Sequence, residues 1–268
     1  MLDKKMLENI EKALLSTKTK TIKTGFQDLN YFLKGIDSSA LITIGARPSM
    51  GKTAFLITLL INFLRQKKKC LFLSLEMSVK TIVTRMISQI TEISTIHLRE
   101  GNFDKNNIEK IHWAISEIAD FDLTLTYGIS DINSITEQIE NQKPDFVFID
   151  YIQLIYSNSK QSRAEVLSDI LRKLKKTAKD NDCIIFISSQ LSRSKLADGS
   201  DRRPKISDLK ENKNISDVII FLYREEYYDN ENPEYKNKGE LTIVKNNFGI
   251  CGRIELQFNR KCSKWKDI

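Results

Sequence analysis

Short runs of β-branched and aromatic residues alternate with amphipathic stretches over most of this chain. The apolar runs lie at residues 41–46, 70–76, 123–127, 145–151 and 183–190. Apolar positions at helical spacing predict helices at about residues 52–66, 79–92, 105–119, 132–141 and 164–180. Strands and helices that alternate in this order predict an α/β fold, in which a mostly parallel central sheet carries helices on both faces.

The pattern changes in the C-terminal part of the chain. Three apolar runs, at residues 217–224, 240–246 and 252–258, follow one another with short polar segments between them. Because these segments carry no helical spacing, we expect a β-rich C-terminal extension of the same sheet. No internal repeat or Pro/Gly-rich linker divides residues 24–268, so we expect a single domain there.

Residues 1–23 differ from the rest. Their apolar positions recur at helical spacing, at Leu2, Met6, Ile10, Ala13 and Leu14, and a basic stretch follows. This pattern predicts one amphipathic helix on a tether. Its apolar stripe needs a surface to cover, either on a neighbouring subunit or on its own domain.

The composition is that of an ordinary globular protein. Of the 268 residues, 41% are hydrophobic and 29% are charged, which excludes collagen-like, coiled-coil and disordered classes. The longest apolar runs fall short of the ~18–20 residues of a membrane-spanning helix. We therefore expect an intracellular, cytoplasmic protein without a membrane partner. The net charge of +7 permits a polyanionic partner such as a nucleic acid.

A phosphate-binding loop follows the first strand. Its residues are Ala46, Arg47, Pro48, Ser49, Met50, Gly51, Lys52 and Thr53, and they lead directly into a predicted helix. Small residues at the two ends of the loop let backbone N–H groups and the helix N-terminus face phosphate oxygens. Lys52 supplies a positive charge and the Thr53 hydroxyl can bind Mg²⁺, so we expect a site for ATP and Mg²⁺.

Three further strands end in polar side chains. Asp150 ends one apolar run, Glu76 ends another and Gln190 ends a third. Ligands of open α/β sheets bind at the C-terminal ends of the strands, where we expect these side chains to meet. Asp150 is placed to hold Mg²⁺ together with Thr53, and Glu76 to activate a water molecule.

Several motifs together resemble the motor domain of DnaB-type replicative DNA helicases. These are ARPSMGKTAF, FLSLEMS, FIDYIQL, ISSQLSR, SDLKE and VKNNFG, within a likeness that runs from residue 24 to the C-terminus. The resemblance implies a RecA-like P-loop NTPase fold, a homohexameric ring, ATP bound between subunits and 5'-3' movement on single-stranded DNA near the nucleoid. It also implies that Glu76 is the catalytic base, that Gln190 senses the γ-phosphate and that the N-terminal helix packs on a neighbouring subunit.

Two of the departures from this family bear on the expected partners and turnover. Only about 23 residues precede the motor, so the family's N-terminal domain is missing and primase is not expected as a partner. The chain is then a naturally short homologue or a fragment covering the C-terminal domain. Where the family carries an Arg that reaches the next subunit's ATP, this chain has Asn247. We expect low turnover unless Lys245 or Arg253 replaces that charge.

Basic residues after Gln190 are the candidates for contact with DNA. The segment is polar and lacks an apolar anchor, so it can face a channel and touch phosphates without reading bases. The expected contacts are Arg193, Lys195, Arg202, Arg203, Lys210, Glu211 and Lys213.

The leading hypothesis is therefore an ATP-driven helicase motor. A second is an ATP-binding paralogue with weak or no catalysis that regulates or loads a full-length helicase, which Asn247 and the missing domain favour. A third, a recombinase that forms open filaments, is disfavoured by the FLSLEMS and FIDYIQL motifs.

Overall fold

The structure is a computed structural model. It describes residues 3, 7–8, 11, 23–34, 36, 38–157, 162–192, 201–209 and 213–268. Most of the helix expected at residues 1–23 lies outside these residues, and so do Arg193, Lys195, Lys210 and Glu211, which were expected to contact DNA.

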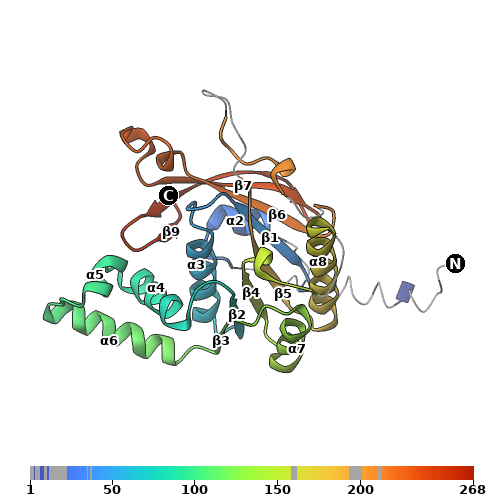
Figure 1. The fold of residues 1–268 in the computed structure, drawn as a ribbon, viewed down its shortest axis with the longest axis horizontal. Coiled ribbons are helices and arrows are strands. Elements are labelled where there is room, and N and C mark those ends of the chain that lie inside the picture. Colours follow the sequence, from blue (N-terminus) through green and yellow to red (C-terminus); the bar gives the residue numbers. More distant parts are fainter. Residues whose placement is uncertain are drawn as a thin grey trace.

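In the described part of the chain, nine strands form one sheet in the order β3-β2-β4-β5-β1-β6-β7-β8-β9 (Figure 1). The strands are β1 (Leu41–Ala46), β2 (Cys70–Ser74), β3 (Leu123–Tyr127), β4 (Phe146–Asp150), β5 (Ile184–Gln190), β6 (Val218–Tyr223), β7 (Lys238–Asn246), β8 (Gly252–Asn259) and β9 (Lys264–Lys266). Strands β1 to β6 pair in parallel. Strands β6 to β9 pair antiparallel, which confirms the expected extension.

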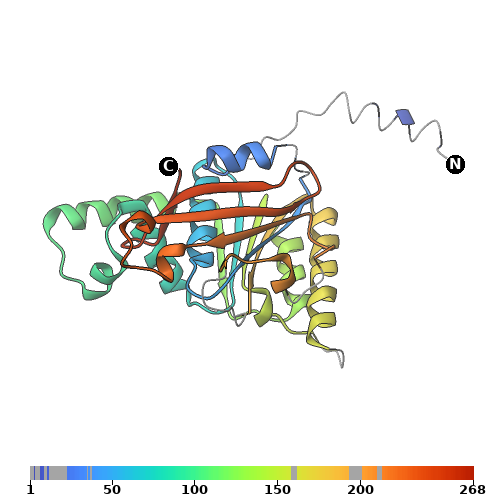
Figure 2. The same ribbon diagram turned by 90° about the horizontal axis from the view of Figure 1, so that it is seen from above.

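Helices cover both faces of the parallel strands. They are α2 (Gln27–Phe32), α3 (Lys52–Arg65), α4 (Val79–Thr91), α5 (Thr95–Glu100), α6 (Lys105–Ala119), α7 (Ile132–Gln142) and α8 (Arg163–Asp180). One hydrophobic cluster joins α3, α4 and α6 to one face of the sheet, and another joins α7 and α8 to the opposite face (Figure 2). The mostly parallel α/β fold expected from the alternating pattern is therefore confirmed.

The first four residues of β4, 146–149, are all apolar because the strand is covered on both faces. Phe146 and Phe148 face α3, whereas Val147 and Ile149 face α7 and α8. Because successive side chains point to opposite faces, a strand covered on both sides needs apolar residues at every position. The ring of Phe63 in α3 stacks on Phe146 with centroids 3.9 Å apart, which ties this helix to the sheet.

Three short elements differ from the expected pattern. The helices α2 and α5 and the strand β9 were not predicted. The two helices have six residues each and β9 has three, so none is long enough to show a clear period. Among the described residues, no helix is both long and apolar enough to cross a membrane.

Candidate nucleotide-binding site

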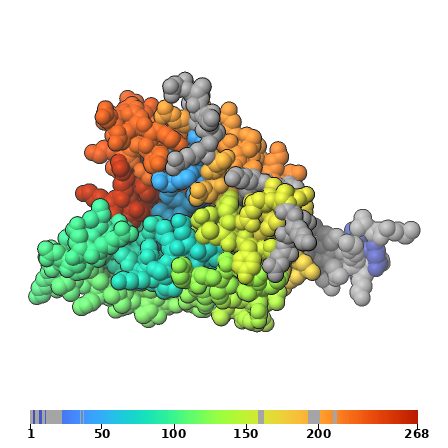
Figure 3. All heavy atoms as spheres, in the orientation of Figure 1, coloured from blue at the N-terminus to red at the C-terminus, as the bar shows by residue number. Residues whose placement is uncertain are grey.

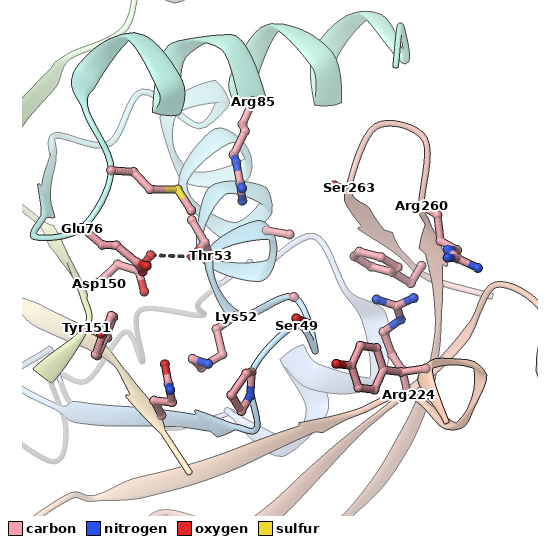
Figure 4. A pocket seen from close by; sticks show the side chains of 17 residues that line it. Ser49, Lys52, Thr53, Glu76, Arg85, Asp150, Tyr151, Arg224, Arg260 and Ser263 are labelled. Atoms are coloured by element: carbon pink, nitrogen blue, oxygen red, sulfur yellow. Dashed lines mark hydrogen bonds between the residues drawn. The ribbon is translucent and has the colours of Figure 1, made fainter. Parts of the chain in front are cut away.

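A cavity of about 590 Å³ opens where the parallel strands end (Figures 3 and 4). Residues of the loop before α3 form its floor, strand-end residues form one wall, and α4 and the C-terminal strands form the others (Figure 4). Its lining includes Pro48, Ser49, Gly51, Lys52, Thr53, Glu76, Arg85, Asp150, Tyr151, Gln190, Arg224, Tyr227, Phe258 and Arg260. The cavity thus brings together the P-loop and the three polar strand ends predicted from sequence.

The glycine of the loop is required by its conformation and its neighbours. Gly51 has a φ of 93°, in the left-handed region that favours glycine. A Cβ atom at this position would lie 3.1 Å from Trp265 Nε1 and 3.2 Å from the Phe258 ring. The Trp265 indole N–H also donates to the Gly51 carbonyl over 3.1 Å. The C-terminal strands therefore fix the turn from which α3 begins.

The Lys52 ammonium group is buried at the start of α3. Its Nζ donates to the Ala46 carbonyl over 3.2 Å. Burial lowers the pKa of Lys52, while the charges of Asp150 and Glu76 raise it in part. A cation that gives up hydration in this way gains by meeting an anion, which is the condition expected of a phosphate-binding lysine.

Thr53 and Asp150 are already joined. The Thr53 hydroxyl donates to Asp150 Oδ2 over 2.5 Å (Figure 4). The Ser188 hydroxyl donates to the other carboxylate oxygen. Asp150 is only 2% exposed. Hydroxyl and carboxylate oxygens are the hard donors that Mg²⁺ prefers, and several coordination positions remain for phosphate and water. This donor set fits the magnesium site expected at these two residues.

Glu76 stands in the short connection between β2 and α4. Two turn bonds hold this connection, because Ser74 Oγ donates to the Met77 carbonyl over 2.5 Å and the Ser78 side chain accepts the Thr81 N–H at the N-terminus of α4. Glu76 lies beside Asp150 at the cavity (Figure 4). Since β2 pairs directly with β4, the two carboxylates come from adjacent strands, as expected.

Gln190 ends β5 at the same edge of the sheet. Its backbone N–H donates to Gln153 Oε1 over 3.0 Å, and Gln153 Nε2 donates to the Ser189 hydroxyl over 2.9 Å. Gln153 therefore supports the end of β5. The Gln190 side chain is left to line the cavity.

Part of the predicted loop does not reach the cavity with its side chains. Met50 is 1% exposed and packs in the core. Arg47 is 6% exposed and points to Tyr228 and Asp208. Ala46 contributes its carbonyl as the acceptor for Lys52. We had expected all three to bind nucleotide as members of the loop, and only backbone contacts remain open to Arg47 and Met50.

Several cavity residues were not among the site residues expected from the sequence. Arg85 of α4 points toward Thr53 (Figure 4), and burial lowers the pKa of its guanidinium. None of the described carboxylates lies within ion-pair distance of it. Arg224 lies over the Phe258 ring, with its Cζ 3.9 Å from the centroid, and pairs with Glu226 over 3.3 Å. These residues come from elements far apart in sequence, so the pattern carried no signal of their meeting.

The residues expected to act on a neighbouring subunit lie away from this cavity. Because β7 runs antiparallel to β6, Lys245 and Asn247 stand at the sheet edge opposite the P-loop. The Lys245 ammonium donates to the carbonyls of Asn214 and Ser216, over 3.0 Å and 2.5 Å. The Asn247 N–H donates to the Asp217 carbonyl over 2.9 Å. Neither residue can therefore serve the cavity of its own subunit.

Three of the expected DNA contacts fall in the described residues. The Arg203 guanidinium donates to both carboxylate oxygens of Glu240 in β7, which raises its pKa. Arg202 lies over the Tyr228 ring, 5.1 Å from its centroid. Lys213 is exposed. Arg203 was expected to contact DNA, but it already forms a strong ion pair with Glu240. A DNA phosphate would have to compete with Glu240 for its guanidinium.

Comparisons with known proteins agree with this arrangement. The family model "DnaB-like helicase C terminal domain" matches residues 21–267. The chain is 35% identical over 254 residues to a probable plasmid replicative DNA helicase of Chlamydia psittaci, covering 91% of this chain and 55% of that protein. It is 36% identical over 274 residues to the replicative DNA helicase DnaB of Buchnera aphidicola subsp. Baizongia pistaciae, covering 97% and 58%. The chain thus spans little more than half the length of these relatives.

Solved structures give the same result. One of them, an isolated ATPase domain, superposes with a TM-score of 0.89 at 29% identity, covering 98% of both chains. A DnaB-like replicative helicase studied for its interactions with primase superposes with a TM-score of 0.89 at 30% identity, covering 100% of this chain and 68% of that one. The RecA-like fold expected from the sequence motifs is therefore supported by structure as well as by sequence.

The contact between Trp265 and Gly51 leads to a first prediction. Trp265→Phe removes the hydrogen bond to the Gly51 carbonyl and should weaken the binding of a fluorescent ADP analogue by about two- to tenfold, as expected for a hydrogen bond of about 0.5–1.5 kcal/mol. The control is Phe63→Leu, which disturbs the core far from the cavity. Both variants should unfold at lower urea concentrations, but an unchanged affinity in Trp265→Phe would contradict the assigned role.

Proposed function

Since the chain belongs to the family of DnaB-like helicase C-terminal domains, we propose that it is the motor of a ring-shaped helicase that uses ATP hydrolysis to move along single-stranded DNA in the 5'-3' direction. The observation that carries this proposal is the joined pair of Thr53 and Asp150, which lies in one cavity with Lys52 and Glu76. Binding alone needs only the loop, whereas hydrolysis also needs the two carboxylates beside it.

Each residue has a distinct task in this proposal. Lys52 and the N-terminus of α3 bind the β- and γ-phosphate oxygens. Thr53 and Asp150 would hold Mg²⁺, which would neutralise charge on the phosphates. Glu76 accepts a proton from the attacking water, so that the water oxygen can bond to the γ-phosphorus as the bond to the leaving ADP oxygen breaks.

Two further side chains complete the site. Gln190 contacts the γ-phosphate, which ATP has and ADP lacks, and so transmits the presence or loss of this phosphate to β5. Arg85 faces the phosphates from α4 and supplies a positive charge in the same subunit. Burial disfavours the charged form of the Arg85 guanidinium, so a bound anion would stabilise that charged form. The adenine base of the bound ATP lies toward Tyr227 and Arg260, at the far end of the cavity.

A second feature supports the proposal of a ring, namely the projecting helices α5 and α6 (Figure 1). Their surface exposes Ile96, Trp113 and Ile115, at 66%, 56% and 49%. Trp113 and Ile115 are two residues apart on α6 and point to different sides of it. An amphipathic helix with one apolar stripe, as expected at residues 1–23 of a neighbouring copy, would cover the side that carries Trp113. The sheet edge that carries Lys245 would then face the nucleotide of the next subunit. The proposed partners are single-stranded DNA and further copies of this chain, within the cytoplasm.

A second candidate function follows from Asn247. An Asn at the position of the family's Arg leaves the transition state without a charge worth about 10³–10⁵ in rate in other NTPases. The chain would then bind ATP and regulate or load a full-length helicase. Arg85 in the same cavity argues for the catalytic reading, because it offers a positive charge that needs no neighbour.

The catalytic reading predicts an ATPase that DNA stimulates and that depends on Lys52. Lys52→Ala should remove DNA-stimulated phosphate release, because the phosphates lose their main positive charge. The matched control, Lys80→Ala on the exposed start of α4, should keep the activity of the parent protein. Equal phosphate release from Lys52→Ala and the parent would refute the proposal.

Restoring the absent charge separates the two candidate functions. Asn247→Arg should raise turnover at least about tenfold in the assembled protein if the site lacks only a neighbouring guanidinium. Asn247→Ala serves as control and should not raise turnover. A parent protein that is inactive alone yet changes the ATPase rate of a full-length helicase, with no gain from Asn247→Arg, would favour the regulator.

The proposed ring depends on the apolar surface of α6. Trp113→Ala should lower the fraction of assembled protein in native mass spectra recorded with ATP, Mg²⁺ and single-stranded DNA. The neighbouring exposed residue provides the control variant His112→Ala, which should assemble as the parent does. An unchanged distribution of masses in Trp113→Ala would show that this surface is not the subunit contact.

A further inference from the structure

The side chain of Arg47 connects the nucleotide loop to a distant segment. Arg47 follows β1 directly, yet its guanidinium turns away from the cavity, and the residue as a whole is only 6% exposed. Nη2 lies 3.8 Å from Asp208 Oδ2, and Nη1 donates to the Tyr228 hydroxyl over 3.3 Å. Both charges are shielded from water, with side chains 7% and 16% exposed. Shielding from water strengthens the attraction between the two charges, so a displacement of one side chain changes the force on the other.

Asp208 belongs to the described segment 201–209, which contains Arg202 and Arg203, two of the residues expected to contact DNA. Its Oδ2 accepts the Lys205 N–H over 3.0 Å, so the carboxylate also holds the backbone of its own turn. Ile206 and Leu209 on either side pack against a small cluster that contains Leu191 and Phe221. The segment is therefore attached to the sheet as well as to the P-loop.

Nucleotide binding acts on the residue beside Arg47. The carbonyl of Ala46 accepts both Lys52 Nζ, over 3.2 Å, and the Leu191 N–H, over 3.0 Å. A phosphate in the loop competes for the same ammonium group. When Lys52 turns toward a phosphate, the hydrogen bonding of the Ala46 carbonyl changes. Ala46 immediately precedes Arg47, and its carbonyl also accepts the N–H of Leu191, which follows Gln190.

We propose that Arg47 is a positioning residue that transmits the state of the nucleotide to segment 201–209 through its ion pair with Asp208. The proposal rests on the proposed function for the claim that this segment governs DNA contacts. It assigns the DNA response to a path that leaves the P-loop directly and does not pass through the Gln190 side chain. The path requires charge on both partners, because the attraction across 3.8 Å is electrostatic and not a hydrogen bond.

Hydrogen exchange of the whole chain tests the path without any need for DNA. A non-hydrolysable ATP analogue with Mg²⁺ should protect the P-loop amides and change the exchange of residues 201–209 in the parent protein. Asp208→Asn should keep the P-loop protection and lose the change at residues 201–209. The matched control is Asp201→Asn, on the same segment but paired with Arg203, and it should keep both responses. A response at residues 201–209 that persists in Asp208→Asn would overturn the proposal.

A second measurement connects the path to activity. In Asp208→Asn, the ratio of ATPase rates with and without single-stranded DNA should fall by about fivefold or more, whereas Asp201→Asn keeps the parent's ratio. Arg47→Gln should lower the ratio to the same extent, and the double variant should be no worse than either single variant. Additive losses would refute a shared path.

The outcomes also separate this inference from the proposed function. Absence of P-loop protection in the parent protein would contradict nucleotide binding, and with it both proposals. P-loop protection without any response at residues 201–209 would overturn the coupling through Arg47 and leave the ATPase proposal standing.

Discussion

The parallel pairing of four strands determines where the polar groups at the strand ends of the site stand. Strand β4 pairs with β2 and β5, and β1 pairs with β5, so the C-terminal ends of all four meet at one edge. Asp150, Gln190 and the P-loop stand at that edge because their strands are held in this register. Aromatic rings also pack α3 against this sheet, since Phe63 stacks on Phe146 of β4 and its ring centroid lies 5.9 Å from that of Phe186 in β5.

The antiparallel strands do more than extend the sheet. Phe258 of β8 and Trp265 of β9 pack against Gly51, and Arg224 after β6 covers Phe258. The last part of the chain thus supports the first functional loop. Folding of the nucleotide site therefore requires contacts between residues that are more than two hundred positions apart, such as the bond from Trp265 to Gly51.

The sequence predicted the parts of the site that local pattern controls. A strand followed by a glycine loop and a helix has a strong period, and polar residues that end apolar runs are visible without a structure. Arg85 could not be found in this way, because on α4 it reads as one more charged residue of an amphipathic helix. The turn of Arg47 away from the cavity was also not predictable, since it depends on Asp208 and Tyr228, which only tertiary packing brings near. The short α5 and β9 were missed because too few residues repeat.

The positions of the two tryptophans have a practical consequence. The chain has only Trp113 and Trp265. In the single chain Trp113 is 56% exposed on α6, whereas Trp265 is 1% exposed beneath the P-loop. Indole emission shifts to shorter wavelength in apolar surroundings, so the two residues emit in different parts of the spectrum. One unlabelled sample can thus report on two separate regions of the molecule at once, the outer helices through the red side of its fluorescence and the phosphate loop through the blue side.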